Sequence, residues 1–171
     1  GKPVGYFYGC YANTHETDVA VAAVQVLEAA GFEVVIPRQE CCGLPALGQG
    51  DIEEARRMAG RNVPSLLAAV RSGLEIVFTS TSCGHMIKYE YSRFLEIPDA
   101  DEVARHFHEL FDYLRDLQSR RLFNVRFRPR PMRAAYFAPC HLRSLQIGFP
   151  SLEILRHIPE LKIEMVDADC C

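Results

Sequence analysis

Four cysteines in the first half of the chain are spaced as the ligands of one metal or redox centre would be. Cys10 is followed after thirty residues by Cys41-Cys42-Gly43, and Cys83 comes thirty-nine residues later. Thiolates are soft ligands that select iron–sulfur clusters, zinc or cuprous copper. Neighbouring cysteines are strained disulfide partners, whereas Gly43 allows a tight turn behind the pair. We therefore interpret the pattern as a metal or redox site, with small buried core cysteines as the alternative.

Three further cysteines repeat this pattern in the second half. Gly5 to Cys10 matches Ala135 to Cys140 at an offset of 130, and the pair at 41 and 42 matches the pair at 170 and 171 at an offset of 129. A repeat of this kind indicates two copies of one structural unit. The candidate cofactor-binding and metal-binding residues are therefore Cys10, Cys41, Cys42, Cys83, Cys140, Cys170 and Cys171.

Alternating strands and helices are expected to position these cysteines. Apolar patterns predict strands at 4–8, 32–36, 74–79, 134–138 and 161–166, with the strand at 32–36 buried. They predict helices at 17–30, 51–71, 84–94, 102–121 and 145–157. This order favours parallel sheets with right-handed crossovers, whose ligands gather outside the carboxyl ends of the strands. We predict an α/β fold of two tandem Rossmann-like units, the second incomplete, with the first four cysteines at one sheet edge.

The boundary between the units is expected in an arginine-rich connector. Residues 120–133 hold six arginines and two prolines, so we place the first unit at 1–125 and the start of the second at 126–171. The connector is interpreted as a solvated linker. Peripheral contact with anionic lipid or with an acidic partner subunit is the alternative.

Composition excludes several classes of function. A net charge of −3 is too balanced for a nucleic-acid-binding protein, which would carry a clustered basic field. No apolar run reaches the roughly 18 residues of a membrane-spanning helix, and the start of the chain does not resemble a signal peptide. The glycine-rich stretch 43–50 lacks the lysine of a phosphate-binding loop. We expect a cytoplasmic protein that binds neither nucleic acid nor nucleotide.

Three histidines lie close to the cysteine loops, namely His15, His85 and His141. An imidazole can ligate a metal or transfer a proton. For each of them a surface position or a supporting role around the ligands is the preferred interpretation. His85, two residues after Cys83, is the first choice if a ligand other than cysteine exists.

The cysteine pattern resembles a known family. The motif Cys-x30-Cys-Cys-Gly-x39-Cys, followed by Pro139-Cys140-His141-Leu142 and by Asp169-Cys170-Cys171, is similar to the CCG cysteine-rich family. That family is shared by the B subunit of heterodisulfide reductase, lactate-utilisation iron–sulfur proteins and glycolate oxidase iron–sulfur subunits. Within it, the resemblance is greatest to the C subunits of anaerobic glycerol-3-phosphate dehydrogenases, and it covers nearly the whole chain.

The resemblance implies an iron–sulfur cofactor. In the family each unit can bind a four-iron four-sulfur cluster, which in heterodisulfide reductase is noncubane and is held by a cysteine, an adjacent pair and a final Cys-x-x-Cys. Here Met86 replaces the last of these cysteines, so four thiolates remain for an ordinary cluster or for zinc. The second copy stops at Cys171, before the family's final cysteines. We therefore expect a fragment of a longer subunit with an incomplete second site.

The implied function is electron transfer within an oxidoreductase complex of anaerobic respiration. The subunit would relay electrons from a flavoprotein dehydrogenase to quinone, in the cytoplasm or at the inner face of the cell membrane, and would not be catalytic alone. Two alternatives remain. One is a catalytic cluster subunit of the thiol-disulfide (heterodisulfide) reductase type, and the other is a zinc-binding interaction module.

Overall fold

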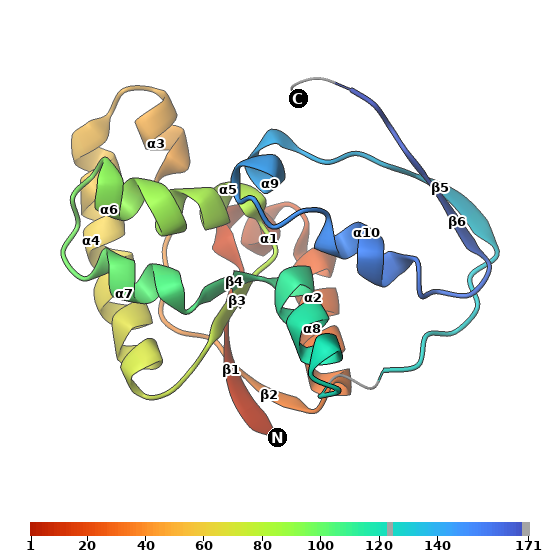
Figure 1. Cartoon of the computed structure of the whole chain (residues 1–171). Coiled ribbons are helices and arrows are strands. Elements are labelled where there is room, and N and C mark those ends of the chain that lie inside the picture. The colour runs from red at the N-terminus through yellow and green to blue at the C-terminus, as the bar shows by residue number, and fades with distance from the viewer. Residues whose placement is uncertain (123–124, 169–171) are drawn as a thin grey trace. The chain divides into compact units, whose positions relative to one another are not determined.

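A four-stranded parallel sheet organises the first unit, Gly1–Leu110. In the computed structural model, which describes residues 1–122 and 125–168, the strands pair in the order β2, β1, β3, β4 (Figure 1). Their bounds are Lys2–Phe7 for β1, Phe32–Val35 for β2, Ile76–Phe78 for β3 and Phe107–Glu109 for β4. Since every pairing is parallel, the carboxyl ends of the strands lie along one edge of the sheet.

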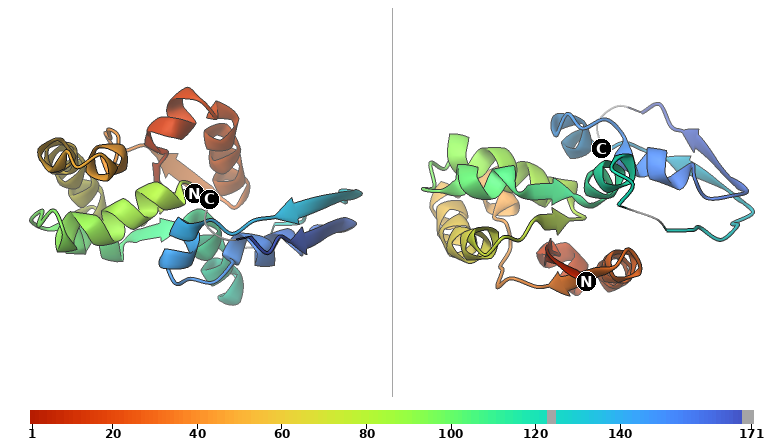
Figure 2. Two further views of the ribbon diagram at one scale, coloured as in Figure 1. Left: turned by 90° about the horizontal axis from the view of Figure 1, so that it is seen from above. Right: turned by 60° about the horizontal axis from the view of Figure 1, so that its bottom comes forward.

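Helices cover both faces of this sheet. The helices α1 (Gly9–Thr14) and α2 (Thr17–Ala29) connect β1 to β2, and α3 (Leu44–Gly48) and α4 (Ile52–Arg71) connect β2 to β3. The two crossovers run in opposite directions along the sheet, so right-handed connections place α2 and α4 on opposite faces (Figure 2). Within the described ranges, no helix has the length and apolar character that crossing a bilayer requires.

A continuous helical segment leads from β3 back to β4. It consists of α5 (Thr81–His85), a π-helical turn (Met86–Glu90) and α6 (Tyr91–Arg93), and α7 (Ala100–Arg105) follows. The π-helical turn is unusual, because such turns are rare and occur frequently at functional sites. Here it separates Cys83 in α5 from Tyr91 in α6.

Three phenylalanines fill the core beneath the carboxyl edge of the sheet. Phe78 stacks on Phe107 with ring centroids 4.7 Å apart, and Phe7 meets Phe107 edge-on at 5.6 Å. All three side chains are fully buried. Aromatic pairs in these orientations contribute about 0.5–1.5 kcal/mol beyond their buried area. The last residues of β1 and β3 are therefore held in fixed positions just before the cysteine loops begin.

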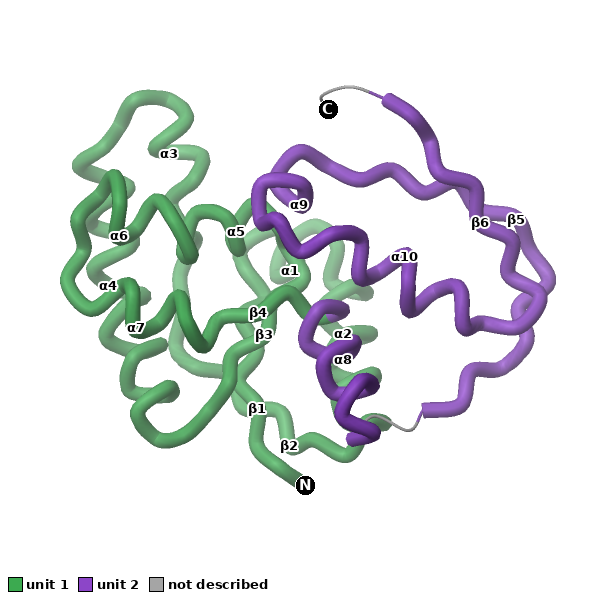
Figure 3. Tube along the Cα trace, in the orientation of Figure 1, with its two compact units in different colours: residues 1–110 green, residues 111–171 purple. Residues whose placement is uncertain are grey.

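The second unit, Phe111–Cys171, repeats the opening of the first (Figure 3). Its strands β5 (Met132–Tyr136) and β6 (Leu161–Met165) pair in parallel, as β1 and β2 do. Between them lie the helices α9 (Cys140–Ser144) and α10 (Pro150–Leu155). The predicted α/β class with parallel sheets is confirmed in both units. The predicted boundary between the two sequence repeats, which we place between residues 125 and 126, stays a prediction.

The predicted helix over 102–121 is wrong in its middle. The chain forms α7, then the strand β4, and only then α8 (Leu110–Ser119). The apolar spacing of this stretch suits a helix, but the edge of β3 offers hydrogen-bonding groups that a strand can satisfy. Ile76 N donates to His106 O at 2.8 Å, and Ile76 pairs with Phe107. Sheet pairing therefore overrides the local periodicity.

Two smaller expectations also differ from the structure. The helix predicted at 145–157 is shortened to α10, because Gly148 adopts a positive φ of 73° and Pro150 takes the first helical position. The strand predicted to be buried at 32–36 is β2, which lies at the edge of the sheet and alternates between half-buried and exposed residues.

Candidate functional site

Four cysteine side chains meet at the carboxyl edge of the four-stranded sheet. Cys10 lies in the first turn of α1, Cys41 and Cys42 precede α3, and Cys83 lies in α5. The Sγ atom of Cys10 is 3.4 Å from that of Cys41. Cys42 hydrogen-bonds with both Cys41 and Cys83. We call these four residues the thiol cluster.

The thiol cluster has an exposed side and a buried side. Cys10 is exposed and Cys41 is half-buried, whereas only 2% of Cys42 and 6% of Cys83 are accessible to solvent. The inner pair is therefore shielded from water. The outer pair faces the surface of the unit.

Hydrogen bonds within the thiol cluster give its members different acidities. The thiol of Cys42 lowers the pKa of Cys41 to about 5, and the backbone N–H of Gly43 adds to this effect. Burial raises the pKa of Cys10 to about 11, and its hydrogen bond to Cys41 acts in the same direction. The pKa of Cys42 is raised well above its ordinary value because its thiol hydrogen-bonds with Cys41 and Cys83. The thiol of Cys42 also lowers the pKa of Cys83, so Cys41 and Cys83 are the thiolates that this arrangement favours.

A buried asparagine holds the backbone of the cysteine pair. Asn62 of α4 accepts a hydrogen bond from Glu40 N at 2.8 Å and donates to Cys41 O at 3.1 Å. It also donates to the hydroxyl of Tyr91 at 3.2 Å, and this hydroxyl in turn donates to Cys42 O at 2.9 Å. Both carbonyls of the pair are thus fixed by side chains of two helices. Asn62 and Tyr91 are fully buried, so the hydrogen bonds are shielded from competing water.

Removing the hydroxyl of Tyr91 should loosen this arrangement. In Tyr91→Phe, Cys42 O and the amide of Asn62 each lose a buried partner, and we expect the free energy of unfolding to fall by about 1–3 kcal/mol. Urea denaturation followed by circular dichroism measures the change. Tyr11→Phe is the control, since the ring of Tyr11 is exposed and the effect should stay within about 0.5 kcal/mol. Equal losses in the two variants would contradict the role of Tyr91.

A glutamine joins the first cysteine loop to the second. Gln39 accepts hydrogen bonds from the backbone N–H groups of Tyr8 at 2.9 Å and Gly9 at 3.3 Å, and donates to Tyr6 O at 3.1 Å. Gln39 therefore connects the backbone just before Cys10 to the segment that leads into Cys41. Sequence reasoning missed Gln39, Asn62 and Tyr91. The only signal available was the position of Gln39 two residues before Cys41.

Two glycines allow the backbone to approach the thiol cluster. Gly9 has a φ of 72°, and a Cβ atom there would lie 3.0 Å from the sulfur of Cys83. Gly43 has a φ of 86°, and an added Cβ would lie 3.3 Å from the backbone of Ala55. The tight turn expected behind the cysteine pair is present at Gly43.

The other sequence-predicted residues lie elsewhere. Cys140 begins α9 in the second unit, directly after β5, as Cys10 follows β1. Cys170 and Cys171 lie outside the described residues. Met86 is fully buried, as expected of a core methionine. The ring of His85 hydrogen-bonds with Glu90 at 3.1 Å and meets the ring of Tyr89 edge-on at 5.3 Å.

The donor set of the thiol cluster suits an iron–sulfur cluster in number and chemistry. Four thiols match the four-thiolate complement of such a cluster. Among the described residues, no group of three or more Cys, His, Asp or Glu side chains has the geometry to hold a single metal ion. Since the outer sulfurs are in contact, they must separate to bind a larger group. Only Cys10 and Cys41 lie near the surface, where such a movement displaces the fewest neighbours.

The fold and the thiol cluster define a cysteine-rich α/β protein. Residues 4–88 match the family model described as the cysteine-rich domain, CCG. These residues contain all four cysteines of the thiol cluster. The first unit of this chain therefore contains a cysteine-rich domain of the CCG family.

Individual relatives extend the similarity to nearly the whole chain. The C subunit of anaerobic glycerol-3-phosphate dehydrogenase from Escherichia coli is 30% identical over 98% of this chain and 42% of its own length. The B subunit of fumarate reductase (CoM/CoB) from Methanothermobacter marburgensis is 30% identical over 100% of this chain and 33% of its own. An uncharacterised iron–sulfur protein from Methanocaldococcus jannaschii is 32% identical over 98% and 32%. The chain thus spans less than half the length of these relatives, two of which are named as oxidoreductase subunits.

Proposed function

We propose that this chain is the iron–sulfur part of an electron-transfer subunit and that its thiol cluster binds one four-iron four-sulfur cluster. The observation that carries the proposal is the meeting of Cys10, Cys41, Cys42 and Cys83 at one edge of a parallel sheet. Three separate loops contribute these thiols. A chance arrangement of core cysteines does not explain their contact, because Cys10 is exposed.

Each residue has a distinct part in this proposal. A bound cluster would supply one-electron transfer. Cys42 and Cys83 would hold its inner side, away from water, and Cys10 and Cys41 its outer side. Asn62 and Tyr91 fix the carbonyls of the cysteine pair, so the two thiols leave the backbone in defined directions.

The proposal extends to the complex in which this chain would work. The electrons would come from a flavoprotein subunit of a dehydrogenase like that for glycerol-3-phosphate and pass to quinone, at the inner face of the cell membrane. Cys140, Cys170 and Cys171 would begin a second site that needs further ligands. The ordinary or noncubane form of the cluster is decided by whether a fifth thiolate joins, and Met86 at the corresponding position favours the ordinary form.

Anaerobic purification tests this function directly. We expect a brown protein with about four irons and four sulfides per chain, by the stoichiometry of such a cluster. Electron paramagnetic resonance of the reduced protein should show a signal that disappears on oxidation. A colourless protein that contains one zinc ion and gives no such signal would instead identify the zinc-binding module.

A second function, the reduction of a disulfide substrate, is favoured by the distance between two sulfurs. The 3.4 Å between the sulfurs of Cys10 and Cys41 suits a dithiol that reduces a disulfide substrate. In that reaction the two thiols lose two electrons and two protons and form one disulfide, and the substrate disulfide becomes two thiols. Iron-free protein that reduces a small disulfide, and loses this activity in Cys10→Ser, would support it. Inactivity of the iron-free protein would leave electron transfer through the cluster as the function.

A further inference from the structure

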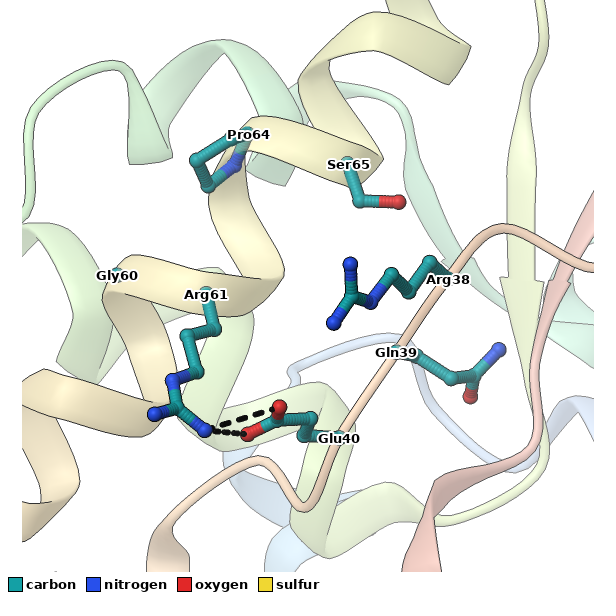
Figure 4. A pocket seen from close by; sticks show the side chains of 7 residues that line it. All are labelled: Arg38, Gln39, Glu40, Gly60, Arg61, Pro64 and Ser65. Carbon is teal, nitrogen blue, oxygen red and sulfur yellow. Dashed lines mark hydrogen bonds and ion pairs between the residues drawn. The ribbon is translucent and has the colours of Figure 1, made fainter.

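A polar cavity of about 540 Å³ lies next to the segment that leads into the cysteine pair. Residues 38–40, between β2 and Cys41, form one wall, and the middle of α4 forms the other (Figure 4). Its volume falls within the range of about 300–1,000 Å³ that is typical of small-molecule sites. None of its lining residues belongs to the thiol cluster.

The lining of the cavity carries an excess of positive charge. Arg61 forms an ion pair with Glu40 at 3.2 Å, which balances one guanidinium. Arg38 extends from its loop toward α4 (Figure 4), and no hydrogen bond or ion pair is recorded for it within residues 1–122 and 125–168. Within the described residues, one positive charge of the cavity is therefore not balanced by a protein group.

Two features of α4 add hydrogen-bonding capacity to the same cavity. Ser65 lines the cavity with a hydroxyl that can donate or accept. Pro64 has no N–H, so the carbonyl of Gly60 lacks the amide donor that an ordinary helix residue would provide. Gly60 and Pro64 both line the cavity.

We propose that this cavity binds a small oxyanion, with Arg38 as its main contact and Ser65 as a supporting donor. A guanidinium presents two parallel N–H groups that match a phosphate or carboxylate group. The site does not depend on iron in the thiol cluster. Its wall is nevertheless continuous with that cluster, because Gln39 holds Gly9 and the N–H of Glu40 donates to Asn62. A bound anion would order the segment that carries Cys41.

Titration of the full chain with two anions tests the proposal. Inorganic phosphate and acetate are added separately at constant ionic strength, and binding is followed by calorimetry. We expect saturable binding, weakened about 10- to 100-fold in Arg38→Gln by the loss of charge-assisted hydrogen bonds. Arg105→Gln is the matched control, because Arg105 is exposed on α7, outside the cavity, and should leave binding unchanged. Tighter phosphate binding would identify a phosphate ester as the ligand, and tighter acetate binding a carboxylate.

A second variant separates loss of the site from loss of the fold. Gly60 lines the cavity and a Cβ atom there meets no atom within 4 Å, so the side chain in Gly60→Leu should occupy part of the cavity. We expect binding to disappear and the melting temperature to stay equal or rise, since leucine favours helix more than glycine does. The absence of saturable binding of either anion to the parent chain, or equal weakening in Arg38→Gln and Arg105→Gln, would overturn the proposal.

Discussion

Replacing Cys42 by serine is expected to remove most of the iron bound by the thiol cluster. Cys42 is shielded from solvent, as only 2% of it is accessible, and it hydrogen-bonds with two of the other three thiols. A hydroxyl oxygen is a hard and weakly acidic donor, and iron–sulfur clusters are held by soft thiolates. After anaerobic reconstitution, Cys42→Ser should contain less than about one of the four irons of a complete cluster. Iron and sulfide analysis per chain provides the measurement.

The matched control for this prediction is Cys140→Ser. Cys140 lies in the second unit and is not a member of the thiol cluster. Its replacement should leave about four irons per chain, by the stoichiometry of one complete cluster. Unchanged iron and sulfide in Cys42→Ser would refute the assignment of the thiol cluster as the iron site. A matching loss in Cys140→Ser would show that the loss of iron is not specific to the thiol cluster.

Replacing Gly84 by alanine is expected to give the largest loss of stability. An added Cβ would overlap the ring of Phe78, which is fully buried and stacked on Phe107. Since the ring has no space to move into, we expect the free energy of unfolding to fall by about 2–4 kcal/mol. Gly84 also follows Cys83 directly, so any shift of α5 displaces an inner thiol. Chemical denaturation of the parent and the variant measures the loss.

The same substitution at Gly60 serves as its control. Gly60 is an exposed residue in the interior of α4, and no atom lies within 4 Å of an added Cβ. Gly60→Ala should therefore raise the free energy of unfolding by about 0.5–1 kcal/mol, the usual gain in a helix. Opposite signs in the two variants would confirm that close packing at Gly84, and not glycine replacement in general, is responsible. A stable Gly84→Ala protein would contradict the packing described at Phe78.

Local signals were sufficient for the elements that carry the cysteines. Strand β1 and helix α2 were predicted within two residues at each end, because apolar spacing and Gly31 mark them clearly. The sequence Asp-x-x-Glu at 51–54 is a typical helix start, and Asp51 caps α4 by accepting a hydrogen bond from Glu54 N at 3.0 Å. From these elements and the parallel-sheet rule, the meeting of the four cysteines at one edge could be inferred.

Contacts between distant residues could not be inferred in this way. Asn62 resembles any polar residue in an amphipathic helix, and sequence reasoning would place it in solvent. It is buried because its amide group is satisfied by Glu40, Cys41 and Tyr91, which lie 21 to 29 residues away. The strand β4 was missed for the same physical reason. Its pairing with β3 depends on an open sheet edge that no local pattern reveals.

The separation of the four cysteines along the chain also bears on how the unit folds. Cys10 and Cys41 are 31 residues apart, so a group bound by both would close a long loop. A cross-link over a loop of this length restricts the unfolded chain by about 3–5 kcal/mol in the chain-entropy description used for disulfides. A bound cluster would therefore add a cross-link between segments that are otherwise held together by packing and by the hydrogen bonds of Gln39. Loss of iron would therefore reduce the cooperativity of unfolding while the pairing of the strands stays unchanged.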